Sequence, residues 1–142
     1  MDEKKYLTKK NKLHILIMEA SPTARKTQSR TLMQAGHTVV IAETDAGAYI
    51  LTAVEKCFAE SNRPFDVVTV SMFFGTIDGA DAVLRIRQLG YDGLIFGVTG
   101  NLESDESDRV LSCGADGVLA KPIDLESFNN AVKGDFIAIF DY

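Results

Sequence analysis

Five short apolar segments alternate with stretches of helical periodicity along this chain. The segments are Leu13–Met18, Thr38–Ala42, Val67–Val70, Leu94–Val98 and Gly117–Ala120. Each has the length of a strand and is rich in β-branched or aliphatic residues. Unbroken apolar runs are typical of parallel strands that are covered on both faces. The pattern therefore predicts a five-stranded parallel sheet.

The stretches between these segments carry helix boundaries. Ser21 and Pro22 place a capping hydroxyl before a proline at the first helical position, and Gly36 closes that helix. Four more helices are expected over Asp45–Glu60, after Gly79, over Leu102–Cys113, and from Asp124 to just before Gly134. Five strand–helix units in series predict a doubly wound α/β fold with right-handed crossovers and helices on both faces.

Two helices have faces that the periodicity leaves less regular. Gln28 and Thr31 occupy inward positions of the first helix, where large aliphatic residues are expected, so its packing is predicted to be weak. In the helix after Gly79, Leu89 is predicted to face inward with Ala82, Val83 and Ile86. Arg85 and Arg87 are predicted to face outward.

Composition restricts the class of protein. A chain of 142 residues with 46% hydrophobic residues is sufficient for one domain, expected at 13–133 after a flexible lead-in at 1–12. Residues 134–142 form an apolar tail whose role the sequence leaves open. The net charge of −5 disfavours nucleic acid as a partner, and the chain contains no apolar run long enough to span a membrane, so we expect a cytoplasmic protein. Cys57 and Cys113 are expected to be reduced packing residues.

Polar side chains end the predicted strands, where ligands collect in such sheets. Four longer stretches around these ends are Ile15–Lys26, Phe65–Gly79, Gly97–Asn101 and Gly114–Asp124. In sequence, order and spacing they resemble the response-regulator receiver domains of two-component signalling. The resemblance implies a flavodoxin-like three-layer sandwich with strand order 2-1-3-4-5.

The resemblance also locates a site. In a receiver, two acidic residues after the first strand and an aspartate after the third hold Mg²⁺, and that aspartate accepts a phosphoryl group. The corresponding residues here are Glu19, Ala20 and Ser71, so two of the three carboxylates are missing. The threonine and lysine that contact the phosphoryl group correspond to Thr99 and Lys121. The resemblance thus implies a degenerate pseudo-receiver that lacks the phosphoacceptor aspartate.

Several expectations follow from these replacements. Mg²⁺ prefers charged oxygen ligands, so we expect its binding to be weak or absent, with no other cofactor and no catalytic residue. A serine hydroxyl needs a neighbouring base to attack phosphorus, and none is evident at the strand ends. The switch position that is aromatic in many receivers is Val118. We hypothesise that Lys121 pairs with Glu19, with Ser71, or with both.

The function predicted from these residues is a non-catalytic signalling module that binds a protein partner. A histidine kinase, a phosphotransfer protein or another signalling domain would fit, and a homodimer is left open. Basic residues of the first helix, Arg25, Lys26 and Arg30, form the candidate partner face, and the acidic start of the fourth helix is a second candidate. The alternatives are regulation by a serine kinase acting on Ser71 or Ser104, and flavin or nucleotide binding.

Overall fold

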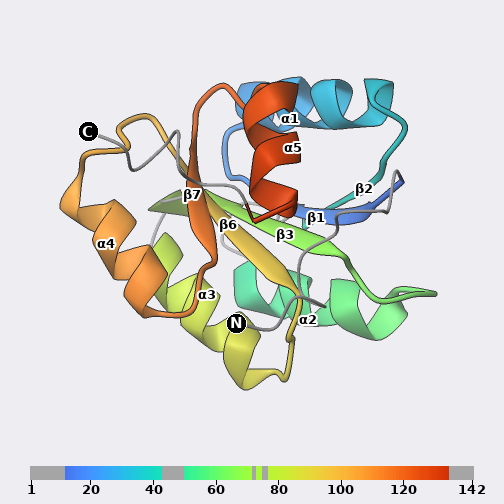
Figure 1. Cartoon of the computed structure of the whole chain (residues 1–142). Helices are drawn as coiled ribbons and strands as arrows, with labels where there is room; N and C mark the ends of the chain where they lie inside the picture. The colour runs from blue at the N-terminus through green and yellow to red at the C-terminus, as the bar shows by residue number, and fades with distance from the viewer. Residues whose placement is uncertain (1–11, 43–49, 72, 75–76, 135–142) are drawn as a thin grey trace.

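Five parallel strands form the central sheet of this protein (Figure 1). The structure is a computed structural model, and it describes residues 12–42, 50–71, 73–74 and 77–134. The strands are β1 (His14–Met18), β2 (Thr38–Ile41), β3 (Val67–Ser71), β6 (Leu94–Thr99) and β7 (Gly117–Ala120). Their order across the sheet is β2-β1-β3-β6-β7, which confirms the predicted order and the flavodoxin-like class.

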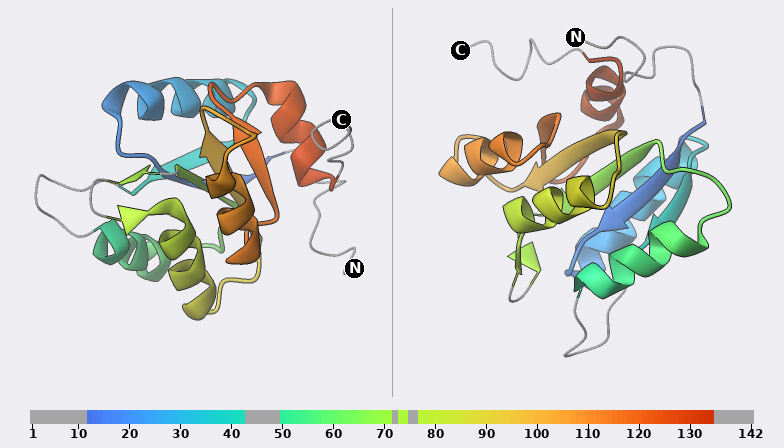
Figure 2. Two further views of the ribbon diagram at one scale, coloured as in Figure 1. Left: turned by 90° about the vertical axis from the view of Figure 1, so that its left-hand side faces the viewer. Right: turned by 90° about the horizontal axis from the view of Figure 1, so that it is seen from below.

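Helices cover both faces of this sheet, as the doubly wound pattern requires. They are α1 (Pro22–Gln34), α2 (Ile50–Glu60), α3 (Gly79–Gln88), α4 (Asp105–Ser112) and α5 (Leu125–Val132). Helices α1 and α5 lie on one face, and α2, α3 and α4 lie on the other (Figures 1 and 2). A short antiparallel pair that the periodicity did not predict, β4 (Phe73–Phe74) and β5 (Ile77–Asp78), leads from β3 into α3.

Side chains of alternating strand residues pack into two separate cores. On the α1 and α5 face, Ile15 and Ile17 of β1 join Leu32 and Phe128. On the opposite face, Leu16 and Met18 of the same strand join other buried residues, among them Val83 and Ile86 of α3. All five residues of β3 are buried, which places this strand at the centre of both cores.

Local capping sets the boundaries of the helices next to the strand ends. The Ser21 hydroxyl accepts a hydrogen bond from the main chain of Ala24 at 3.3 Å, and Gly36 closes α1 with a φ of 97°. Asp124 caps α5 in the same way, accepting the main-chain N–H of Ser127 at 2.8 Å. This hydrogen bond, with another from the Ser127 hydroxyl, lowers the pKa of Asp124. The predicted cap at Ser21 and the predicted closure at Gly36 are confirmed, and the cap at Asp124 is an addition.

The predicted faces of α3 need one correction. Ala82, Val83 and Ile86 are buried as expected, but Leu89 follows the end of the helix and is 40% exposed. Arg87, predicted to face outward, instead turns inward and donates to the carbonyls of Gly114, Tyr91 and Gly93 at 3.0, 2.9 and 2.8 Å. It also pairs with Asp116 at 3.0 Å. These three carbonyls lie in the loops after α3 and α4 and need hydrogen-bond donors. The long side chain of Arg87, at the end of α3, supplies them.

Some expectations lie outside the described residues. They are the lead-in at 1–11, the start of the second helix before Ile50, and the tail at 135–142. Within the described part of the chain, α4 begins at Asp105, later than predicted, and Cys57 and Cys113 are free, half-buried thiols packed against one core. None of the described helices is long and apolar enough to cross a bilayer.

The contrast between the two arginines of α3 gives a stability prediction. Arg87→Ala removes one partner of a largely buried ion pair and three carbonyl contacts, so unfolding free energy should fall by about 3 kcal/mol. Arg85 forms only an exposed ion pair with Glu55 at 2.9 Å, so Arg85→Ala should cost less than about 1 kcal/mol. Urea denaturation at neutral pH measures both. Equal losses in the two variants would contradict the assignment of Arg87 as a structural residue.

Candidate functional site

A hollow of about 550 Å³ opens where the carboxyl ends of the strands converge. We call it the strand-end hollow. Its lining includes all five residues predicted for the degenerate phosphoacceptor site, and the full set is Glu19, Ala20, Ser21, Ser71, Val98, Thr99, Gly100, Asn101, Glu106 and Lys121. The five residues that the sequence analysis assigned to one site therefore line the same hollow in the structure.

Strand register explains why these residues meet. Ser71 is the last residue of β3 and is in register with Val98 of β6, one residue before Thr99. Thr99 is in register with Ala120 of β7, and the main-chain N–H of Lys121 donates to the Thr99 carbonyl at 2.7 Å. Parallel pairing thus holds three strand ends at one level.

Glu19 is the most strongly held carboxylate of this site, with only 3% of the residue exposed. Its Oε1 lies 2.6 Å from Nζ of Lys121 and accepts a hydrogen bond from the Gln28 amide at 3.3 Å. Its Oε2 accepts the main-chain N–H of Ser21 at 3.0 Å. Both oxygens are therefore engaged by groups of the chain itself, as a buried carboxylate requires.

Lys121 connects the ends of β1, β3 and β7. Besides its ion pair with Glu19, its Nζ donates to Oγ of Ser71 at 3.2 Å. The lysine side chain is 31% exposed and is part of the lining of the hollow. The hypothesis that Lys121 pairs with Glu19, with Ser71 or with both is confirmed in its fullest form.

Thr99 and Val118 are positioned differently from the charged residues. The Thr99 hydroxyl accepts the main-chain N–H of Asn101 at 3.1 Å and shapes the turn after β6. Val118, the predicted switch position, is 2% exposed and belongs to the core on the α3 face, not to the lining of the hollow. The structure therefore separates the switch position from the charged cluster.

Two residues of the site escaped the sequence analysis. Gln28, interpreted as a weak point of the first helix, is buried because its amide donates to Glu19. Glu106, from the first turn of α4, lines the hollow, so a second glutamate does lie at this site. The polar side chain of Gln28 at an inward helical position could have indicated that it has a buried hydrogen-bond partner. For Glu106 the signal was the acidic start of the fourth helix.

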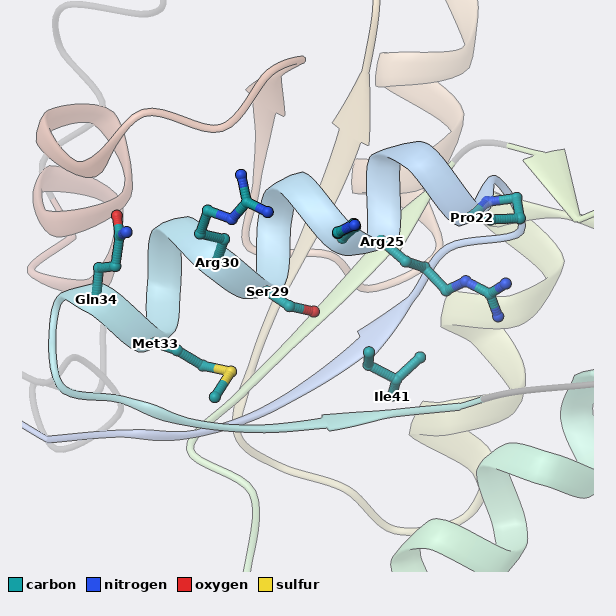
Figure 3. A pocket seen from close by; sticks show the side chains of 8 residues that line it. Pro22, Arg25, Ser29, Arg30, Met33, Gln34 and Ile41 are labelled. Atoms are coloured by element: carbon teal, nitrogen blue, oxygen red, sulfur yellow. The ribbon is translucent and has the colours of Figure 1, made fainter.

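The candidate partner face forms a second hollow, away from the strand ends. Arg25, Lys26 and Arg30 line a groove of about 650 Å³ between α1 and the end of β2 (Figure 3). We call it the α1 groove, and its full lining is Pro22, Arg25, Lys26, Ser29, Arg30, Met33, Gln34 and Ile41. The structure thus joins the predicted basic residues to an apolar surface that the sequence did not reveal.

Comparison with known proteins identifies the family of this domain. The family model of the response regulator receiver domain matches residues 15–133. The sensor protein EvgS of Escherichia coli K12 is 29% identical over 120 residues, which cover 84% of this chain and 9% of that protein. The sensor histidine kinase RcsC of Salmonella typhi is 33% identical over 72 residues, covering 51% of this chain and 8% of that protein.

Solved structures agree with this match at the level of the fold. A receiver domain from Clostridium thermocellum has a TM-score of 0.72 at 20% identity, covering 92% of this chain and 99% of that one. A response regulator from Burkholderia pseudomallei, solved with a phosphorylated aspartic acid, has a TM-score of 0.70 at 21% identity, covering 91% of this chain and 72% of that one. The chain belongs to the response regulator receiver domain family of two-component signalling. It spans less than a tenth of the length of these two sensor proteins.

A double-mutant cycle on Glu19→Gln and Lys121→Met should give a coupling energy of about 1 to 3 kcal/mol, because the buried carboxylate loses its cation. The matched control is the exposed pair Glu55–Arg85, whose side chains are 42% and 45% exposed, with Glu55→Gln and Arg85→Met. Its coupling should be about 0.5 kcal/mol or less. Urea denaturation measures both cycles. A Glu19–Lys121 coupling no larger than the control would mean that this pair does not hold the strand ends together.

Proposed function

We propose that this chain is a non-catalytic receiver domain that acts through protein–protein interaction and is not phosphorylated in the receiver manner. The observation that carries the proposal is the closed set of contacts between Lys121, Glu19 and Ser71. In a receiver, as the sequence resemblance implies, this lysine balances the charge of an incoming phosphoryl group. Here Glu19 already pairs with that lysine and neutralises its charge.

The residues of the strand-end hollow do not fit the Mg²⁺ ion that the receiver family implies. Mg²⁺ binds in near-octahedral geometry through carboxylate and phosphate oxygens. Ala20 offers no donor atom, Ser71 offers a neutral hydroxyl, and both oxygens of Glu19 are engaged. We therefore derive no step through a metal, and weak or absent Mg²⁺ binding is part of the proposal.

Ser71 is also poorly prepared to act as a nucleophile. The residue is 4% exposed, and its Oγ accepts a hydrogen bond from Nζ of Lys121. Among the described residues, no base accepts the Ser71 proton. A serine attacks phosphorus at a useful rate only when a neighbouring group removes its proton. Its burial equally disfavours a separate serine kinase. The Ser104 hydroxyl is also buried, without a hydrogen-bond partner among the described residues, so it is equally poorly placed for a serine kinase. No contact in the strand-end hollow supports flavin or nucleotide binding to a comparable degree.

A ligand shifts a conformational equilibrium only through different affinities for two states. Without a phosphoryl group as that ligand, the output of this domain would depend on a protein partner. The α1 groove, with Arg25, Lys26 and Arg30, supports a docking face for a histidine kinase, a phosphotransfer protein or another signalling domain. We propose a cytoplasmic location, and a second copy of the chain is an alternative partner.

Intact mass after incubation with acetyl phosphate and Mg²⁺ tests the proposal. The native chain should gain no phosphoryl group, because it lacks a carboxylate acceptor and two of three acidic ligands. The variant Ala20→Asp, Ser71→Asp should gain one, because it restores both. Ala20→Asp alone, which restores a ligand without an acceptor, is the matched control.

Labelling of the native chain would refute the proposal. Failure of the double variant to label, with native-like circular dichroism, would instead show that something beyond these two positions blocks the chemistry.

A further inference from the structure

The two histidines of this chain both lie beside Leu13, at the start of β1, but they have different kinds of partner. His14 is half-buried, and its two ring nitrogens contact the hydroxyls of Thr38 at 2.8 Å and of Ser61 at 3.1 Å. A hydroxyl can donate or accept a hydrogen bond, so the His14 ring keeps its partners whether or not it carries a second proton. The ring of His37 does not have this freedom.

The His37 ring accepts a hydrogen bond from a group that can only donate. The main-chain N–H of Leu13 donates to Nδ1 of His37 at 3.1 Å. Nδ1 is therefore the unprotonated nitrogen, and the proton of the neutral ring is on Nε2. The residue is 9% exposed, and its ring lies 5.7 Å, between ring centroids, from Phe128 of α5. A second proton would set two N–H groups against each other and place a charge beside an apolar core.

The charges around His37 do not offset this cost. Burial lowers the pKa of His37, and the carboxylate of Asp66, just before β3, has a smaller effect in the opposite direction. Strand β2 carries no charged residue. The other charged residues on or beside β1, α1 and α5 within the described ranges are at least partly accessible to water, and they are Lys12, Arg25, Lys26, Arg30, Asp124, Glu126 and Lys133. The surroundings therefore favour the neutral ring.

His37 lies where three elements of one face of the sheet meet. Its main-chain N–H donates to the carbonyl of Leu32, near the end of α1, at 3.2 Å. The next residue, Thr38, begins β2 and donates its main-chain N–H to the Leu13 carbonyl at 2.9 Å. Phe128 belongs to α5, which covers the same face of the sheet as α1 (Figure 1). The ring thus connects the start of β1 and α5 to the turn between α1 and β2.

We propose that His37 is a pH switch: its neutral ring holds the start of β1 and α5 against the turn after α1, and its protonated ring releases them. Because the folded state disfavours the second proton, the released and unfolded states bind more protons. The contacts are therefore intact above pH 6.5, the ordinary pKa of a histidine, and weaken as the pH falls from 6.5 towards the lower pKa of the folded ring. One proton changes such an equilibrium by at most about tenfold per pH unit.

This inference goes beyond the proposed function and does not depend on it. The turn that His37 holds also joins α1 to β2, and residues of both elements line the α1 groove. Acid would therefore alter this groove, together with any partner binding that uses it. The switch itself is measured in the isolated chain, without phosphodonor or partner. Its failure is distinguishable from a failure of the acetyl phosphate experiment.

NMR of the ring nitrogens in the native chain tests the protonation state of His37. In neutral to alkaline solution, Nδ1 should have the chemical shift of an unprotonated nitrogen and Nε2 that of a protonated one. The titration midpoint of His37 should lie below pH 6.5. A proton on Nδ1 in the neutral ring, or a midpoint at or above pH 6.5, would overturn the proposal. This measurement needs no variant, so a folding defect cannot obscure it.

Amide hydrogen exchange tests the release. In the native chain the protection factor of the Leu13 amide should fall below pH 6.5, by up to about tenfold per pH unit. That of Leu16, deeper in β1, should change far less. In His37→Asn the side-chain oxygen can still accept the Leu13 N–H but does not titrate, so protection of Leu13 should be independent of pH.

His14→Asn is the matched control, because it removes the other histidine beside Leu13 and should keep the native pH dependence. Constant protection of Leu13 in the native chain, or the same fall in His37→Asn as in the native chain, would overturn the proposal. Loss of the pH dependence in His14→Asn would also overturn it, because the titrating group would then be His14.

Discussion

Burial of the parallel sheet on both faces is the constraint on which this structure depends. Every residue of β3 is buried, and β3 pairs with β1 on one side and β6 on the other. A slip of one residue would exchange the two cores, so the register is fixed by packing. Because the register is fixed, the strand ends converge whatever residues occupy them. The position of the strand-end hollow is therefore set by packing and not by the residues that line it.

The contacts in the strand-end hollow are made between groups of the chain itself. Glu19 satisfies Lys121, and Gln28 and the main chain of Ser21 satisfy Glu19. The Glu19 carboxylate and the Gln28 amide, each 3% exposed, would otherwise be buried without a partner at a considerable cost. These contacts all come from the chain itself, and under the proposed function no phosphoryl ligand selects a second arrangement of the loops.

The sequence predicted those features that depend on local pattern, and it missed those that depend on distant backbone. The strands match within a residue, and the caps of α1 and α5 are present because Ser21, Gly36 and Asp124 act on their own neighbours. Arg87 was misassigned because its acceptor carbonyls come from two loops, one after α3 and one after α4, that meet only in the folded protein. Gln28 was undervalued for the same reason, since its partner Glu19 precedes the helix. The α1 groove requires β2 beside α1, which periodicity alone does not show.

The depth of the Glu19–Lys121 pair has a consequence for how the domain responds to its solution. Mobile ions screen charges that face water but reach a carboxylate that is 3% exposed far less. Added salt would weaken electrostatic attraction at Arg25, Lys26 and Arg30 while leaving the strand ends held together. We therefore expect ionic strength to change binding through these three cations far more than it changes the Glu19–Lys121 pair.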